Sequence, residues 1–399
     1  MKISCPLLIL VVLWGTSPAA SAADVKTLLD DIKSVDREAQ GNRKAQAAVR
    51  ELTKNDDVSL TVVLEAFAGA NPLAANWLRG AFESLADARL KATKTLPKKQ
   101  LEEFVLDTRH DPRARRLAYE WLIKVDDTAS NRLIPGMLND SSVEFRRDAV
   151  ARLLTQANTL FDAGQKEQSQ PIYQMALSGA RTDDQSKEIV DKLHELGQEV
   201  DLPEHFGLLL SWKLIGPFDN SDEAGFDVAY PPEEKIDPNG KYQGKDSTEV
   251  TWTEYATSDD YGIVDLTKAQ AAHKGAITYA YTDFVSEEDR EVELRLGTPN
   301  AWKVWVNGEL VFGREEYHRG TRLDQYQFPA KLKKGHNDIL IKVCQNEQKE
   351  SWAQKWEFQL RVCDPVGTAI LSTNRPPRVL PEKEAAQTAR TRDTTHEEA

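Results

Sequence analysis

The chain has 399 residues, more than one hydrophobic core normally holds, so its length predicts two domains. Acidic residues outnumber basic ones by 64 to 51, giving a net charge of −13 that argues against nucleic acid and anionic membrane surfaces as partners. The same acidity also fits the simpler role of keeping an exported protein soluble.

Residues 1–22 have the pattern of a cleaved secretory signal peptide. Lys2 precedes the apolar run Pro6–Leu13, and Ala20-Ser21-Ala22 offers small residues at a cleavage site. The run is too short to span a bilayer, although an uncleaved N-terminal anchor is the alternative. No later segment is apolar enough to span a membrane. We therefore expect an exported protein that is periplasmic or extracellular.

Residues 23–200 show helical spacing throughout. The clearest segment, Pro112–Val125, has apolar residues every three or four positions and follows Asp111, a good capping residue placed before a helix-starting proline. The run Arg115–Ala118 has an echo 31 residues later in Arg146–Ala149. A period of this length indicates stacked helix pairs, with an irregular helical bundle as the alternative.

The helical segment resembles known repeat families. Asp140–Ala149, and Asp111–Ala118 with a shorter gap, are similar to the second helix of HEAT repeats, which often begins with Asp-x-x-x-x-Arg and an Ala soon after. Ala157–Leu177 is similar to one tetratricopeptide unit. Both resemblances imply an α-solenoid of helix pairs that stack into a one-dimensional scaffold.

Beyond a predicted linker at 201–207, the apolar spacing falls to two. Short strand patterns at turn-bounded intervals predict an antiparallel β-sandwich or jelly roll over residues 208–365, and so an α + β multidomain fold. The tail 372–399 is rich in Thr, Arg, Pro and Glu and is predicted to be disordered. The strand patterns cover Ser211–Phe218, Val250–Tyr255, Gly262–Leu266, Ala276–Phe284, Val292–Leu296, Trp302–Val306, Glu309–Phe312, Ile339–Val343 and Trp356–Cys363.

One hairpin is predicted in detail. Only Asn307-Gly308 separates the apolar runs Trp302–Val306 and Glu309–Phe312. Asn and Gly both accept a positive φ, which a two-residue type I′ turn requires at its two central positions. The sequence therefore predicts a tight hairpin here.

The second half resembles the galactose-binding-like jelly roll, including the sugar-binding domain of family 2 glycosidases. There, a strand–Asn-Gly–strand hairpin precedes a Leu-x-x-Gly-x-Asn turn, which reads Leu332–Asn337 in this chain. Trp212–Asn220 is similar to the first strand of such domains in secreted bacterial proteins with helical N-terminal halves. The resemblance covers Leu208–Asp364 and implies the fold more than the function, since many such domains bind no sugar.

Two cysteines, Cys344 and Cys363, remain after signal cleavage. An exported pair permits a disulfide. If 337–345 and 356–363 form a hairpin, however, the two sulfurs lie several residues apart along the ladder, beyond bridging distance.

The sequence contains no nucleophile elbow, metalloprotease motif, P-loop or dinucleotide fingerprint. It also shows no carboxylate pair of the kind glycoside hydrolysis needs. Asp237–Gly240 lacks the remaining ligand spacing of a calcium loop. We therefore predict no catalytic residue, metal site or cofactor, and leave a structural calcium ion open.

The loop after the hairpin combines aromatic rings with polar groups within ten positions. Sugar recognition uses this mixture, because rings stack on the C–H faces of sugars and planar polar groups bind hydroxyls. The alternative is that the tyrosines cover the sandwich edge while Asp324 pairs with an arginine. The candidate ligand-binding residues are Trp302, Tyr317, His318, Arg322, Asp324, Gln325, Tyr326 and Trp352.

These patterns together predict an exported, non-enzymatic binding or scaffold protein. Its jelly-roll module is expected to recognise a glycan or another exported protein. The alternatives are a polysaccharide-active enzyme or its accessory subunit, and a purely structural envelope protein. The sequence leaves the oligomeric state open.

Overall fold

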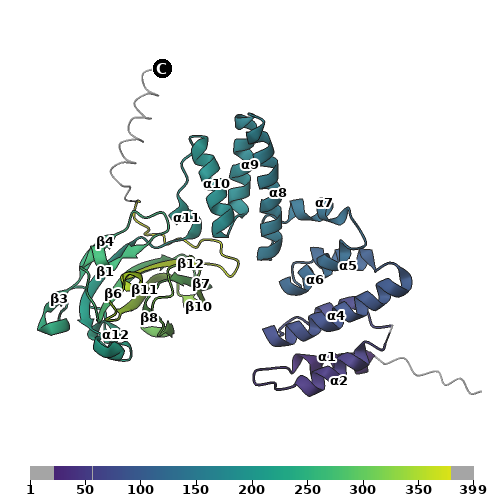
Figure 1. Cartoon of the computed structure of the whole chain (residues 1–399), viewed down its shortest axis with the longest axis horizontal. Coiled ribbons are helices and arrows are strands. Elements are labelled where there is room, and N and C mark those ends of the chain that lie inside the picture. The colour runs from purple at the N-terminus through teal and green to yellow at the C-terminus, as the bar shows by residue number, and fades with distance from the viewer. Residues whose placement is uncertain (1–21, 56, 379–399) are drawn as a thin grey trace, which may run out of the picture. The chain divides into compact units, whose positions relative to one another are not determined.

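The computed structural model describes residues 22–55 and 57–378, so all of the predicted signal peptide except Ala22 lies outside the described residues. Two compact units divide between Leu153 and Leu154. The first is helical, and the second combines helices with antiparallel sheets, which confirms an α + β fold (Figure 1). Within the described ranges, no helix has the length and apolar character needed to cross a membrane.

The helices of the first unit share one hydrophobic core, which runs from Leu29 to Ala149. The predicted helix start at Asp111 is confirmed, and α4 begins with the same kind of cap. The Asn71 side chain accepts a hydrogen bond from the Ala74 backbone N–H at the start of α4, and Asp111 accepts one from Arg113 at the start of α6. The elements are α1 (Ala22–Lys33), α2 (Asn42–Leu52), α3 (Leu60–Glu65), α4 (Pro72–Thr93), α5 (Lys98–Leu106), α6 (Pro112–Leu122), α7 (Ala129–Leu133), η1 (Ile134–Gly136) and the first part of α8 (Val143–Asp162).

The two arginines of the 31-residue echo take similar places. Arg115 and Arg146 are both buried, and both bind Asp140. Arg115 forms an ion pair of 2.7 Å with the Asp140 carboxylate, and Arg146 Nε donates to the Asp140 carbonyl at 2.5 Å. This arrangement ties α6 to the start of α8. The assignment to HEAT repeats stays a prediction.

The second unit begins within α8 and continues through α9 (Lys166–Gly179), α10 (Asp183–Glu195) and α11 (Leu202–Phe206). Val190 and Phe206 from these helices pack in one cluster with Leu208 and Leu210, which lead into the first strand. The structure therefore groups residues 154–206 with the sheets, whereas the sequence suggested a boundary at 201–207. Periodicity marks where strands begin, but it does not report which helices share their core.

Ten strands form two antiparallel sheets. The six-stranded sheet has the order β4-β1-β6-β11-β8-β9, and the four-stranded sheet the order β10-β7-β12-β5. Their members are β1 (Ser211–Asp219), β4 (Thr253–Ala256), β5 (Val264–Asp265), β6 (Ala276–Ser286), β7 (Arg290–Gly297), β8 (Ala301–Val306), β9 (Glu309–Arg314), β10 (Tyr326–Leu332), β11 (Gly335–Gln345) and β12 (Glu357–Cys363).

The short elements lie in the connections between these strands. They are η2 (Ser221–Phe226), α12 (Pro231–Glu234), β2 (Lys241–Gln243), η3 (Lys245–Ser247), β3 (Glu249–Thr251), α13 (Leu266–Ala269) and η4 (Ser351–Ala353), with β2 and β3 paired to each other.

Both sheets contribute to one core, so they pack face to face. Trp212, Val304 and Ile341 come from the six-stranded sheet, and Leu294 and Phe358 from the four-stranded one. A second hydrophobic cluster lies on the other face of the six-stranded sheet. There, side chains of the strands pack beneath the connection that contains η2 and α12. Alternating apolar residues thus bury both faces of this sheet.

Two features of the sheets differ from the sequence predictions. The strand β10 was not predicted, and it contains Pro329; it pairs only with β7, and proline is tolerated on an edge strand. The conditional hairpin of 337–345 with 356–363 is wrong, because β11 and β12 belong to different sheets. Cys344 and Cys363 are both free and buried.

The start of the predicted disordered tail also differs. Ser372 Oγ accepts a hydrogen bond from Val285 N at 2.7 Å, and Arg375 Nη1 donates to Leu208 O at 3.0 Å. Residues 372–378 therefore run along the second unit through specific bonds, while 379–399 lie outside the described residues.

The predicted hairpin between β8 and β9 is confirmed. Val306 pairs with Glu309, and the turn residues Asn307 and Gly308 have φ values of 53° and 80°. We expect Gly308→Val to destabilise the second unit by about 1–3 kcal/mol, because a β-branched residue is strained at this φ. A Cβ at Gly308 would meet no atom within 4 Å, so the loss would report backbone strain alone. Urea unfolding measures it, with Gly308→Asn as the tolerated control. A midpoint equal to that of wild type would contradict the turn assignment.

Candidate functional site

Three loops of the second unit meet at one end of the sheets. One follows β1, one joins β9 to β10, and one joins β11 to β12. The Asn220 amide of the first loop donates to the Tyr317 hydroxyl of the second at 3.2 Å. In the third loop, Asn346 bonds to Glu223 of the first and to His318 of the second, each at 3.0 Å. These hydrogen bonds join the three loops, and we take the cluster as the candidate site.

Buried amides support these loops from below. Asn220, Asn300 and Gln345 are fully buried. Gln345 accepts a bond from Asn300 at 3.3 Å, and its own Nε2 donates to the carbonyls of Ala353 and Lys355 at 3.3 and 3.2 Å. Asn220 donates to the Gln345 backbone carbonyl at 3.1 Å. Because unpaired buried amides are costly, this network fixes where the loop after β11 runs.

The outer layer of the site carries an exposed indole. Trp352 is 61% exposed and stands edge-on to the His318 ring, with ring centres 5.0 Å apart. His318 in turn bonds to the buried Asn346, and Tyr317 lies beside it at 6.1 Å. The indole is therefore held at the surface on an ordered polar support rather than packed into the core.

Strained backbone occurs at the same place. Asp222, Glu223 and His318 have φ values of 53°, 60° and 59°, a region that residues with a side chain rarely adopt. Such conformations cost free energy and cluster at functional sites, so their presence in the interlinked loops supports a recognition role for this end of the unit.

A cavity of about 500 Å³ adjoins these residues. Two of its lining residues, Glu223 and Asn346, belong to the network just described. Glu350, which also lines it, precedes Trp352 by two positions in the same loop. The full lining consists of Asp222, Glu223, Asn346, Glu347, Gln348, Lys349 and Glu350.

Burial determines the protonation state of Tyr317. Desolvation raises its pKa above the ordinary value, and the nearby negative charges of Glu223 and Glu315 act in the same direction, against the opposing hydrogen bond from Asn220. The phenol therefore stays neutral at physiological pH and serves as a hydrogen-bonding group.

The structure brings three of the sequence candidates together, namely Tyr317, His318 and Trp352. Gln325 is half-buried, and its side chain accepts a bond from Thr298 N at 3.1 Å. Arg322 is exposed but lines a different cavity.

Three other candidates make contacts within the unit. Trp302 is fully buried in the shared core, because it points to the same side of β8 as Val304, and so it offers no surface to a ligand. The half-buried Tyr326 packs its ring against Trp302, with centres 5.0 Å apart. Asp324 pairs with Arg361 and Arg295, which agrees with the alternative given for this residue. Ligand binding by Tyr326 and Asp324 stays a prediction.

Sequence reasoning missed the amides and carboxylates of the first and third loops. Asn220 closes the strand that carried the family resemblance, and Asn346 follows β11, so both stand directly after strands. A polar residue directly after a buried strand was the available signal. Nothing in the sequence indicated that the two loops would meet.

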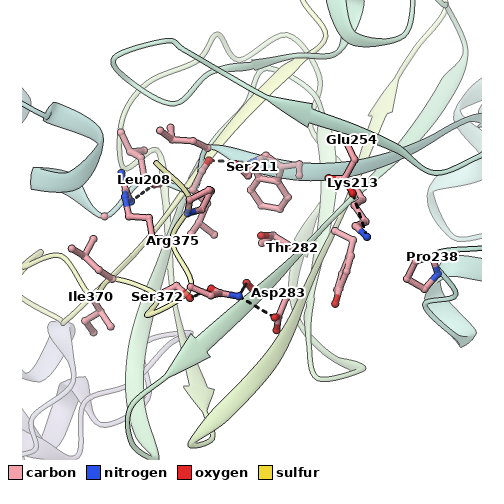
Figure 2. Close-up of a pocket in the computed structure, with 18 residues that line it drawn as sticks. Leu208, Ser211, Lys213, Pro238, Glu254, Thr282, Asp283, Ile370, Ser372 and Arg375 are labelled. Atoms are coloured by element: carbon pink, nitrogen blue, oxygen red, sulfur yellow. Dashed lines mark hydrogen bonds and ion pairs between the residues drawn. The ribbon is translucent and has the colours of Figure 1, made fainter. Parts of the chain in front are cut away.

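Two other cavities are less suited to recognition. Figure 2 shows one of about 430 Å³ beside β1, with the segment that carries Ile370, Ser372 and Arg375 as one wall. Its polar side chains are engaged with each other, as in the 3.4 Å ion pair of Lys213 with Glu254.

A polar cavity of about 1090 Å³ is lined by Asp183 and Lys187 of α10 together with Arg322. It contains charges of both signs and no tryptophan. Across residues 22–55 and 57–378, no group of three or more His, Cys, Asp and Glu side chains is arranged to hold a metal ion.

No known family and no curated protein matches the sequence. Among solved structures, the chain is similar to a family 35 carbohydrate binding module from Clostridium thermocellum, at 15% identity and a TM-score of 0.17 over 22% of this chain and 71% of that one. It is also similar to a β-glucosidase from Kluyveromyces marxianus, at 13% identity and a TM-score of 0.24 over 50% of this chain and 23% of that one.

A third similarity is to a β-glucuronidase from an uncultured Clostridium species, at 16% identity and a TM-score of 0.23 over 40% of this chain and 29% of that one. The matched part is less than a third of either glycosidase. Scores this low do not establish a shared fold, and the function must be argued from the site itself.

Proposed function

We propose that the loop end of the second unit binds a glycan. Trp352 supplies the stacking surface, and His318, which Asn346 holds in place, supplies a hydrogen-bonding group at its edge. The observation that carries the proposal is an indole left 61% exposed while its neighbour His318 is anchored to a buried amide. Large exposed aromatic rings on an ordered support are typical of binding surfaces, because they offer contact area at low entropic cost.

We propose that the rest of the protein exports and supports this binding surface. We propose that residues 1–22 direct export and are removed, and that the protein acts in the periplasm or outside the cell. The helices then form a HEAT-like scaffold, and the two sheets a galactose-binding-like jelly roll. We propose that the role is binding rather than catalysis, because an exposed indole on an ordered support is suited to stacking on a sugar ring.

The test uses Trp352→Ala and His318→Ala in the full chain. Retention on a panel of immobilised acidic, neutral and amine-bearing polysaccharides should fall about tenfold or more, because stacking on one aromatic ring dominates so small a contact. Trp352→Phe, which keeps a ring, should retain part of the binding. Binding of wild type to neutral glycans should persist in about 1 M NaCl, because stacking does not depend on the charges that this salt concentration screens.

The matched control is Leu310→Ala, which removes another exposed apolar side chain, 53% accessible, from β9. It should leave retention unchanged. The Trp352 and Leu310 variants should melt with wild type, since both side chains are exposed. A wild-type protein that binds none of the glycans would refute the proposal and favour a protein partner.

A further inference from the structure

The cavity beside the indole has a strong excess of negative charge. Asp222, Glu223, Glu347 and Glu350 line it, against the single cation Lys349. Among the ion pairs of residues 22–55 and 57–378, none involves these four carboxylates. The ligand's charge therefore matters more here than at most surfaces of the unit.

Two of the carboxylates are fixed by neutral donors. The Asp222 backbone N–H donates to Glu347 Oε2 at 3.1 Å, and the Asn346 amide donates to Glu223 Oε1 at 3.0 Å. Neutral N–H groups orient a carboxylate without cancelling its charge. Glu223 and Glu347 are thus oriented anions that form no ion pair within the described residues.

Two carboxylates of the neighbouring β9–β10 loop are placed differently. Asp324 is paired with two arginines, and Glu316 lies 3.6 Å from both Arg314 and Arg319. These two carboxylates therefore have cationic partners, whereas the ion pairs of the described residues include none of the four at the cavity.

We propose that the glycan recognised here carries protonated amino groups, as an oligosaccharide of free hexosamines does, and that the carboxylates select it over glycans of uronic acids. This inference rests on the proposed glycan-binding function. An ammonium group placed at Glu223 and Glu347 gains charge-assisted hydrogen bonds, whereas a ligand carboxylate in the same place meets like charge. Stacking on Trp352 then holds a neighbouring sugar ring whatever its charge.

The experiment compares three probes by calorimetry at pH 6 and low salt: a glucosamine hexamer, its fully N-acetylated counterpart, and an oligogalacturonate. Wild type should bind the glucosamine hexamer about fivefold or more tightly than the N-acetylated one, and the uronate most weakly, a difference of the size that one exposed ion pair provides. The preference should disappear in about 1 M NaCl, where screening is nearly complete.

The decisive variant is Glu223→Gln with Glu347→Gln, because glutamine keeps the acceptor oxygen while removing the charge. It should lose the preference and bind the N-acetylated hexamer like wild type. The matched control, Glu291→Gln with Glu309→Gln, removes the same charge from exposed positions near the starts of β7 and β9 and should keep the preference.

Equal affinities of wild type for the amine and acetyl forms would overturn the charge selection, as would a preference that survives in the cavity variant. Either result leaves the glycan proposal standing. Failure of wild type to bind any of the three probes would overturn the charge selection, whereas the glycan proposal itself is decided by the polysaccharide panel.

Discussion

Arg361→Met should destabilise the second unit by about 3–5 kcal/mol, the usual cost of removing one partner from a buried ion pair. Arg361 is fully buried on β12, where its Nε and Nη2 donate to the two oxygens of Asp324 at 2.6 and 2.5 Å. Its Nη1 also donates to the backbone carbonyls of Phe206 and Gly367, both at 3.1 Å. One side chain therefore ties β12 to the β9–β10 loop, to α11 and to the segment after β12.

Urea unfolding of the full chain measures the loss. Arg361→Lys should not restore stability, because an ammonium group cannot bind both carboxylate oxygens and two carbonyls in this planar arrangement. The control Arg314→Met removes a half-exposed arginine of β9 and should change stability by less than about 0.5 kcal/mol. A loss below about 1 kcal/mol for Arg361→Met would contradict the central role of this residue.

The pH dependence of the folding stability tests the same prediction independently. Burial alone would raise the pKa of Asp324, but the hydrogen bonds and charges of Arg361 and Arg295 lower it below its ordinary value of 3.8. A lowered carboxyl pKa stabilises the folded state at pH values above 3.8, and that contribution is lost as the pH falls through the folded-state pKa. The stabilities of wild type and Arg361→Met should therefore converge in acid.

Lys342→Met is the second substitution with a large expected effect, also about 3–5 kcal/mol. The Lys342 ammonium group has no exposed surface and donates to the Phe226 and Val228 carbonyls at 2.9 and 2.7 Å and to Glu233 Oε1 at 2.9 Å. It fastens η2 and α12 to the outer face of the six-stranded sheet. Without it, the largely buried Glu233 keeps only the hydroxyl of Tyr279 as a partner.

Burial and the adjacent carboxylate of Glu233 raise the pKa of Tyr279, so its hydroxyl remains protonated and donates. Adding Glu233→Gln to Lys342→Met should therefore recover part of the lost stability, because the stranded charge is removed and the tyrosine keeps an acceptor. Lys331→Met, at an exposed position of β10, is the matched control. Additive losses in the double variant would contradict the pairing of Lys342 with Glu233.

Local signals predicted local structure well. Asp111 before Pro112, and Asn307 before Gly308, each specify a backbone conformation through their own side chains, so a helix start and a turn could be predicted without knowing the fold. The assignment of β11 and β12 to different sheets could not be predicted in this way. Two apolar runs joined by a short connection have the same pattern whether they pair or cross between sheets.

The candidate site also combines features that the sequence predicts with features that it does not. Trp302 and Trp352 are equally conspicuous in the sequence, yet one is core and the other surface. The alternation of Trp302, Val304 and Val306 was the signal that the first tryptophan points inward. The roles of Asn220 and Asn346 depend on loops more than a hundred residues apart, and no short pattern encodes such a meeting.

The positions of the two described cysteines affect how the protein must be handled during refolding. Cys344 lies in the six-stranded sheet and Cys363 in the four-stranded sheet, and burial raises the pKa of their thiols to about 12 and about 11. The folded state thus shields both thiols from oxidants. In the unfolded chain they are close in sequence and free to react, so a disulfide formed at that stage would cross-link two strands that must enter opposite layers. Under oxidising conditions, refolding is therefore a competition between placing the two strands in their separate sheets and oxidation of the thiols, and a reductant favours the native state.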